Sequence, residues 1–231
     1  MTSTEAAVME WRAAYRAELP VATVSRPAFA AGAATAREPG WKPLDQFWRP
    51  EGREPGFQPG SARVLWNERG LLFDIVFAGR GPRNAARSLN EHTWELGDIA
   101  EIFLQREGGE EYLEIHVTPE NQRLQLRWTP AGFAAFRRDL GLLGRFAVSD
   151  PHWIESRSQV RNSDWSVSAF LPASIIDPGA GILGPATRLR VAVCRYDCTA
   201  GPGFVLSSTA RLTQPAYHRR EEWDLLVLDP R

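Results

Sequence analysis

The chain is short of the features that would point to a membrane, a disulfide scaffold or a nucleic-acid partner. Its 231 residues include only two cysteines. No apolar run approaches the roughly 20 residues needed to cross a bilayer, and the first twenty residues carry acidic side chains without the apolar core of a secretory signal. Lys and Arg number 27 against 28 for Asp and Glu, so charge gives no reason to expect nucleic acid or an anionic membrane as partner. We therefore expect a cytoplasmic protein that binds neither.

Sulfur-containing residues are scarce, whereas tryptophan is abundant. Cys194 and Cys198 lack the further ligands of a zinc site, so they are either free thiols or a local disulfide. The only methionines are Met1 and Met9. The nine tryptophans are a high count for this length, and Trp serves both as core filler and as a flat platform for sugars, bases or other rings.

Residues 94–128 carry the clearest pattern, three runs in which apolar and polar residues alternate. Turn-forming residues separate the runs, which predicts a meander of three antiparallel strands. Successive side chains of a strand leave on opposite faces, so each run has an apolar, core-facing row and a mainly polar row. The predicted core-facing residues are Ala100, Ile102, Leu104, Leu113, Ile115, Val117, Leu124, Leu126 and Trp128, and the opposite face carries Glu101, Phe103, Tyr112, Glu114, His116, Arg123, Gln125 and Arg127.

The first turn predicts how the first two strands pair. A four-residue loop at 107–110 places Glu101 opposite His116 and Phe103 opposite Glu114. An aromatic ring is unusual on a solvated sheet face, so we expect a second layer, a loop or a bound ring to cover Phe103.

The second turn extends the pairing to the third strand. A four-residue loop at 119–122 places His116 opposite Gln125 and Glu114 opposite Arg127. Opposite charges are then adjacent, as cross-strand pairs prefer, and the polar face suits a ligand rich in hydroxyl groups. The alternative is a solvated, ion-paired face without a ligand.

The rest of the chain fits an all-β domain. Short alternating runs, turn signals, few helical segments and no internal repeat predict an antiparallel β-sandwich of two sheets. Residues 1–20 are expected to form an appended N-terminal helix or extension, with the helix over 4–18, and residues 21–231 a single sandwich domain. The strands expected outside the meander lie at 62–67, 71–78, 165–171, 187–197, 204–207 and 223–228.

Two neighbouring motifs resemble a known family. WELGDIAEIFL at 94–104, followed by YLEIHVTPENQ at 112–122, is similar to the Trp-Glu-x-Asp, Val-Glu-x-Phe and Tyr-x-Glu-Phe-x-Val-x-Pro motifs of family 9 carbohydrate-binding modules. Weaker similarities in the expected order extend the resemblance over 41–228. The resemblance implies a jelly-roll-like sandwich that binds oligosaccharides or polysaccharides without catalysis.

The resemblance also implies particular binding residues. Members of the family hold a sugar between two tryptophans, which correspond to Trp94 and Tyr217 here, and their acidic hydroxyl partner corresponds to Glu101. A basic position falls near His116, and Arg195 matches the Arg of an Asn-Phe-x-Arg strand. With two residues added from the polar face, the predicted carbohydrate-binding set is Trp94, Tyr217, Glu101, His116, Glu114, Arg127 and Arg195.

Metal content is left open by the sequence. Family members bind structural calcium through loop oxygens, so calcium is allowed by the resemblance. The sequence has no clear Asp and Asn cluster of the required density, and it therefore assigns no metal ligand and no other cofactor.

Two other functions also stay open. Glu101 and Glu114 could form the carboxylate pair of a glycosidase, although cross-strand ion pairing would keep both ionised. Related sandwiches hold haem through Met and His, but Met1 and Met9 lie outside the predicted sandwich. Trp94 is either half of a sugar clamp or a loop aromatic tucked under the sheet edge.

Overall fold

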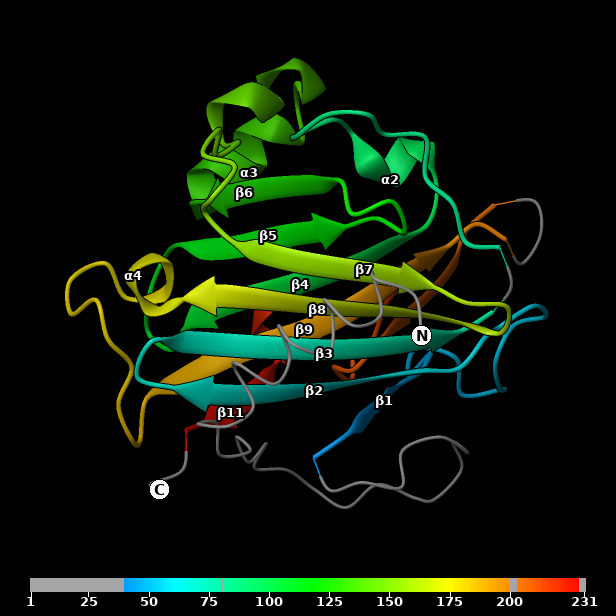
Figure 1. Ribbon diagram of the computed structural model, residues 1–231, viewed down its shortest axis with the longest axis horizontal. Helices are drawn as coiled ribbons and strands as arrows, with labels where there is room; N and C mark the ends of the chain where they lie inside the picture. The colour runs from blue at the N-terminus through cyan, green and yellow to red at the C-terminus, as the bar shows by residue number, and fades with distance from the viewer. Residues whose placement is uncertain (1–39, 80, 200–202, 229–231) are drawn as a thin grey trace.

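Two antiparallel sheets lie face to face in the computed structural model, which describes residues 40–79, 81–199 and 203–228 (Figure 1). In this view the first sheet lies in front of the second. Every strand pairs antiparallel with its neighbours, which confirms the predicted all-β sandwich. The helix predicted over 4–18 lies outside the described residues, and the domain boundary at residue 20 stays a prediction.

The first sheet has five strands and the second has six. In spatial order the first sheet contains β1 (Lys42–Leu44), β2 (Gly60–Asn67), β3 (Gly70–Ala78), β8 (Asp164–Pro172) and β7 (Glu155–Val160). The second contains β10 (Val205–Ser208), β9 (Arg188–Asp197), β4 (Ile99–Arg106), β5 (Tyr112–Val117) and β6 (Arg123–Trp128), with β11 (Asp224–Val227) paired to β9. β10 and β11 pair with different halves of β9, so they follow one another along the same edge.

The helices of the described residues are short and lie between strands. They are α2 (Thr93–Leu96), α3 (Pro130–Phe136), α4 (Ala173–Ile176) and the 3-10 turns η1 (Leu140–Arg145) and η2 (Arg220–Glu222). Within the described residues, no helix is long and apolar enough to cross a membrane.

The space between the sheets is filled by the apolar rows that the alternation predicts for β4 and β5. This inner core includes Ala100, Ile102, Leu104, Leu113, Ile115 and Val117. β3 lies between β2 and β8 and is buried along most of its length, as predicted for a central strand. Its one charged residue, Asp74, accepts hydrogen bonds from Arg63 at 2.9 Å and from Ser168 at 2.8 Å.

The pairing of β4 with β5 is the predicted one. Glu101 lies opposite His116, and Phe103 lies opposite Glu114. These four side chains therefore share the outer face of the second sheet, the face turned away from the inner core.

The pairing of β5 with β6 differs from the prediction by one residue. The loop between them spans 119–121 and is closed by a backbone hydrogen bond of 2.9 Å between residues 118 and 122. Asn121 has a φ of 63°, the left-handed conformation that completes a three-residue hairpin loop. As a result His116 lies opposite Leu124 and not opposite Gln125.

Because of this shift of one residue, every side chain of β6 lies on the opposite face of the sheet from the predicted one. Leu124, Leu126 and Trp128 lie on the outer face beside His116, whereas Arg127 lies on the inner side. The predicted facing of the third strand is therefore wrong.

A second apolar cluster covers the outer face of β9, β4, β5 and β6. Trp128 of β6 packs against Phe136 of α3 at a ring-centroid distance of 5.2 Å, and Phe103 of β4 packs against Trp223 at 5.3 Å. Of the coverings expected for Phe103, which were a second layer, a loop or a bound ring, the structure has a layer of apolar side chains. We call this layer the outer cluster; its buried members are Phe103, Tyr112, Leu124, Leu126, Trp128, Phe136, Leu143, Ala192, Cys194, Ala210, Leu212, Tyr217 and Trp223.

Both cysteines are free thiols. The thiol of Cys194 contacts the Ser208 hydroxyl at 3.3 Å, and the thiol of Cys198 contacts a carboxylate oxygen of Asp98 at 3.0 Å. Of the two alternatives that the sequence leaves open, the structure has the free thiols.

Substitution of Gln125 tests the observed pairing register of β6. Its side chain is fully buried, and its Nε2 donates to the carbonyls of Val148 at 3.1 Å and Asp150 at 3.0 Å. Gln125→Ala removes both bonds, so urea denaturation should show the free energy of unfolding falling by about 1–3 kcal/mol. Gln159→Ala, at a half-buried position on β7, is the control and should change it by less than about 0.5 kcal/mol. Equal effects of the two substitutions would contradict the observed register.

Candidate functional site

A cavity of about 610 Å³ opens on the outer face of the second sheet. Its floor is built by side chains from β4, β5, β6 and β9. One wall comes from α3 and η1, and the other comes from the loop at 215–219, so segments distant in sequence enclose one space.

The cavity brings together five of the seven residues that the sequence predicts to bind carbohydrate. They are Trp94, Glu101, Glu114, His116 and Tyr217. The other two, Arg127 and Arg195, lie on the inner side of the sheet and do not line the cavity.

Arg127 points inward because β6 is shifted by one residue. Its guanidinium pairs with Glu111 at 3.2 Å and donates to the backbone carbonyl of Ile175 at 2.9 Å. It therefore ties the meander to α4 and contributes nothing to the cavity.

Arg195 lies between the two sheets. It pairs across the ladder with Ala100, an inner-core residue, so it shares that face. Its guanidinium stacks over Phe77 at 4.8 Å, pairs with Asp197 at 2.9 Å and donates to the carbonyl of Ala78 at 2.9 Å. The structure thus gives Arg195 a role in packing the sandwich.

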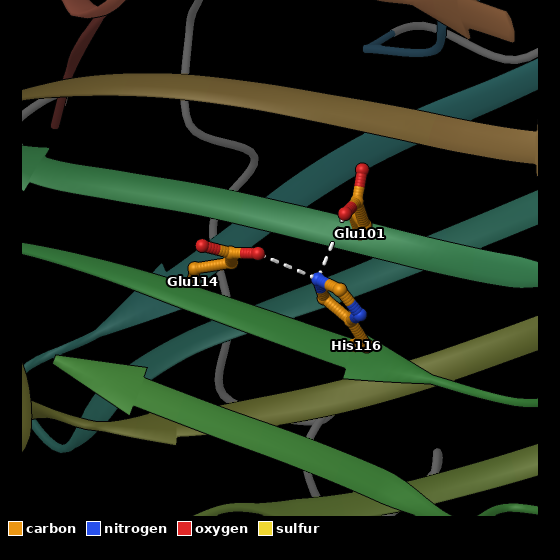
Figure 2. A group of neighbouring side chains, drawn as sticks. All are labelled: Glu101, Glu114 and His116. Carbon is orange, nitrogen blue, oxygen red and sulfur yellow. Dashed lines mark hydrogen bonds and ion pairs between the residues drawn. The ribbon is translucent and has the colours of Figure 1, made fainter. Parts of the chain in front are cut away.

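Two carboxylates point at one nitrogen of His116 on the cavity floor (Figure 2). Nε2 of His116 is 2.7 Å from Oε1 of Glu101 and 2.8 Å from Oε1 of Glu114. The exposed fractions of the three residues are 0%, 3% and 5%, so water does little to solvate their charges. Nδ1 of His116 is 2.7 Å from the hydroxyl of Thr93, which fixes the orientation of the ring.

The two carboxylates differ in how fully they are hydrogen bonded. Oε2 of Glu114 accepts a hydrogen bond of 2.6 Å from Nε1 of Trp128 and lies 3.6 Å from Nε2 of His218. Oε2 of Glu101 is buried and has no hydrogen-bond partner among the residues that the structure describes. Glu101 is therefore the carboxylate with a free acceptor.

Burial and pairing move the pKa values of this cluster. Burial alone would lower the pKa of His116, but the adjacent carboxylates of Glu101 and Glu114 outweigh it and raise the pKa to about 9. Burial raises the pKa of Glu101, and the charge of His116 opposes that rise only in part.

Glu114 is the ionised partner. Burial would raise its pKa, but the rings of His218 and His116 and the indole N–H of Trp128 together lower it. Burial also lowers the pKa of His218. The groups within hydrogen-bond distance of the Glu114 carboxylate are Nε2 of His116 at 2.8 Å and Nε1 of Trp128 at 2.6 Å.

Trp94 reaches the cavity from α2. Gly97 ends this helix with a φ of 145° and lies against Arg83, so close that a Cβ would be 2.1 Å from the Arg83 carbonyl oxygen. Only glycine fits there. The Trp94 ring is half-buried, stacks on His92 at 4.8 Å and meets His116 edge-on at 6.0 Å.

Tyr217 lines the cavity from the opposite loop but is largely buried, with 4% exposed. Its hydroxyl donates to the carbonyl of Arg195 at 2.7 Å and accepts from the backbone N–H of Ser207 at 3.1 Å. The ring thus anchors its loop to β9 and β10, and it presents only a small surface to the cavity.

The comparisons with known proteins agree with this architecture. No family model matches the chain, and no curated protein matches it. A solved structure of a candidate carbohydrate-binding protein from Bacteroides uniformis is similar, with a TM-score of 0.61, 16% identity, and coverage of 81% of this chain and 85% of that one.

Two further solved structures are of a family 9 carbohydrate-binding module from Caldicellulosiruptor kristjanssonii. The one in complex with cellotriose has a TM-score of 0.51 and 14% identity, and it covers 75% of this chain and 76% of that one. The one in complex with glucose has a TM-score of 0.53 and 14% identity, with 75% and 78% covered. The chain has the fold of a family 9 carbohydrate-binding module. The predicted resemblance is confirmed at that level.

Several cavity residues of this family 9-like fold were not predicted from the sequence. His218 stacks on Phe133 at 3.9 Å and its Nδ1 is 2.9 Å from the hydroxyl of Tyr112, so it joins the α3 wall to the floor. Tyr196 of β9 also lines the cavity. His218 could have been suspected because it follows Tyr217 in a loop that contains aromatic residues. No periodic pattern in that loop indicated that it packs over β5.

Metal ligands were also left open by the sequence. Within the described ranges, one group of His, Asp, Glu or Cys has ligand atoms close enough to share an ion, and it is Glu101, Glu114 and His116, whose ligand atoms lie within 4.8 Å of one another. Structural calcium held by loop oxygens stays a prediction. Met1 and Met9 lie outside the described residues, so the haem alternative also stays untested.

The raised pKa of His116 makes stability depend on pH. The folded state keeps the His116 proton up to about pH 9, whereas the unfolded state releases it near 6.5. The stabilisation is therefore complete below about pH 6.5 and is lost as pH rises through about 9, a change on the order of 3 kcal/mol at most.

Urea denaturation between pH 6 and 10, in EDTA-containing buffers, measures this dependence. We expect the unfolding free energy to decline across the interval, and the decline to disappear in His116→Gln. His152→Gln changes an exposed ring outside the cavity and should keep the wild-type slope. Parallel pH profiles for wild type and His116→Gln would show that the cluster does not hold the proton.

Proposed function

We propose that the chain is a non-catalytic carbohydrate-binding domain whose ligand occupies the cavity on the outer sheet face. One observation carries the proposal: a half-buried indole, Trp94, lines the same cavity as Glu101, a buried carboxylate with one oxygen that no described residue hydrogen bonds. The fold shared with family 9 carbohydrate-binding modules supports it.

A saccharide presents two kinds of surface, and the cavity offers a match for each. Its apolar ring faces pack on aromatic side chains, and its hydroxyl groups donate to carboxylates. The volume of 610 Å³ lies within the range of about 300–1,000 Å³ that small-molecule sites occupy. Most of the lining is aromatic or aliphatic. Its charged residues and histidines are Glu101, Glu114 and His116 on the floor and Arg137, His218 and Arg219 on the walls.

Glu101 is the main hydroxyl partner in this arrangement. Its Oε2 is the acceptor that no described residue uses, whereas both oxygens of Glu114 are engaged by His116 and Trp128. His116 and Glu114 then act by holding Glu101 in place. Of the polar residues predicted to bind the sugar, Glu101 is then the direct contact, and His116 and Glu114 are supporting residues.

Trp94 supplies the aromatic platform by itself. His92 already stacks on one side of the indole, so a saccharide would meet the side that borders the cavity. Tyr217 is too deeply buried to offer a full ring face. We therefore expect one-sided stacking above a polar floor and not a clamp of two parallel rings.

Trp94→Ala tests the proposal. The first probes are glucose and cellotriose, the ligands in the structures of similar fold, followed by a glycan array. Isothermal titration calorimetry should show binding to wild type and none to Trp94→Ala, because the platform is gone. The melting temperature should fall by only a few degrees, since the ring is half-buried and a fully buried Trp would cost about 3–5 kcal/mol.

Trp48→Ala is the matched control, since Trp48 is another half-buried tryptophan of the outer cluster that does not line the cavity. It should bind the array ligands as wild type does. If Trp94→Ala kept full saccharide affinity, or if Trp48→Ala lost it, the ligand would lie elsewhere on the surface.

Glycoside hydrolysis is a second candidate. The ligand oxygens of Glu101 and Glu114 lie within 4.8 Å of each other, and the pKa of Glu101 is raised by burial while that of Glu114 is lowered against burial by its imidazole and indole partners. Retaining glycosidases use carboxyl groups about 5 Å apart with separated pKa values.

An aryl glycoside assay distinguishes the two functions. The proposed binding domain should release no more nitrophenol than a blank. Hydrolysis by wild type that is lost in Glu114→Gln, with the melting temperature retained, would assign the protein to the enzymes.

A further inference from the structure

We propose that Glu101, Glu114 and His116 bind one divalent transition-metal ion at the floor of the cavity. The ion would be held by Oε1 of each glutamate and by Nε2 of the histidine, with its remaining positions open to the cavity. The site does not depend on the proposed function, because ion binding can be measured without any saccharide.

The spacing of the three atoms is that of ligands around a small cation. Nε2 of His116 is 2.7 Å and 2.8 Å from the two carboxylate oxygens, and ligand atoms of the group lie within 4.8 Å of one another. Two ligands at about 2.1 Å from a metal and at right angles to each other are about 3 Å apart. Bringing an ion between the three groups would need only small side-chain adjustments.

A proton on Nε2 of His116 cannot satisfy both carboxylates of this cluster. One ring N–H of His116 can point at only one of the two carboxylate oxygens, and the other is left with a charge contact. Glu101 is the poorer in partners, because its Oε2 is buried and accepts no hydrogen bond from any described residue. Buried, under-satisfied carboxylates are costly, and a bound ion is one of the features that explains them. A divalent cation would neutralise both glutamates at once.

The surrounding hydrogen bonds are those that hold metal ligands in position. Nδ1 of His116 faces the hydroxyl of Thr93 at 2.7 Å, so the ring can donate there while Nε2 presents its lone pair. Oε2 of Glu114 accepts from Nε1 of Trp128 at 2.6 Å, which leaves Oε1 directed at the centre of the group. Such outer contacts fix the geometry of ligating groups and raise affinity.

The ligand set favours a particular class of ion. One imidazole with two carboxylates suits Zn²⁺, Mn²⁺ or Fe²⁺, whereas Ca²⁺ and Mg²⁺ prefer oxygen-only sites. All three residues line the cavity, so a bound ion would keep positions for water or for hydroxyl oxygens of a ligand. This is a different site from the loop calcium that the family resemblance allows.

Metal titration of the untagged, EDTA-stripped and dialysed protein tests the site. ZnCl₂ and MnCl₂ are titrated by calorimetry, with CaCl₂ as the comparison, and retained metal is counted by mass spectrometry after desalting. We expect one equivalent of Zn²⁺ or Mn²⁺ per chain, a raised melting temperature on binding, and at most weak binding of Ca²⁺.

Variants separate this site from adventitious binding. His116→Gln and Glu101→Gln should each lower the affinity by at least about tenfold. His152→Gln, which changes an exposed histidine away from the cavity, should bind as wild type does. Near-ultraviolet circular dichroism checks the fold; if His116→Gln is not folded, Glu101→Gln, which keeps the size of its side chain, decides.

No stoichiometric uptake of Zn²⁺ or Mn²⁺ would overturn the proposal. Uptake that survives in Glu101→Gln and His116→Gln, or that is lost in His152→Gln, would overturn it equally. Saccharide titrations with and without Zn²⁺ keep the two proposals apart, because sugar binding by metal-free protein would uphold the proposed function whatever the metal result.

Discussion

Two carboxylates and one imidazole meet under an apolar layer, and the character of the cavity depends on how they share charge. Taking charged groups out of water costs several kcal/mol per ion unless their partners are well placed. Here His116 offsets two glutamates, while Oε2 of Glu101 has no hydrogen-bond partner in the described part of the chain. Buried ion pairs are often no more stabilising than apolar residues packed in their place, so the chemistry of this cluster is the better explanation for it.

The apolar layer above the cluster arises from one short turn. Because the 119–121 loop has three residues with Asn121 in a left-handed conformation, β6 presents Leu126 and Trp128 outward. These side chains give α3 a surface to pack on, and α3 in turn forms a wall of the cavity. The same packing excludes water from Glu114 and His116, which strengthens each charge contact between them. Register, burial and electrostatics are thus parts of one arrangement.

The sequence was informative where alternation was strict and contacts were local. In β4 and β5 it placed Glu101 against His116 and assigned the inner-core rows, because a hairpin with a clear loop has one natural register. For the turn between β5 and β6, the residues around 119–122 are compatible with a loop of three or of four residues. The predicted four-residue loop placed Arg127 on the wrong face of the sheet. The family resemblance pointed to Trp94 through a motif next to the meander, and Trp94 lines the cavity; its role in binding stays a prediction.

Contacts between segments that are distant in the sequence could not be predicted from these local patterns. Whether Tyr217 exposes a ring or buries it depends on the hydrogen bonds of its hydroxyl to β9 and β10, which no local pattern encodes. His218 reaches the floor from a loop without periodicity, and Arg195 looked like a binding residue because its strand resembles one that binds sugar. In each case the missing information was which segment packs on which face.

The central claim is that ligands enter the cavity over the outer face of the second sheet and not some other surface. A crystal structure of the protein soaked with the saccharide that binds best on a glycan array tests this most directly. The account predicts density for a sugar ring against the cavity side of Trp94, with a hydroxyl within hydrogen-bond distance of Oε2 of Glu101. A saccharide bound on another surface, with the cavity holding solvent alone, would contradict it.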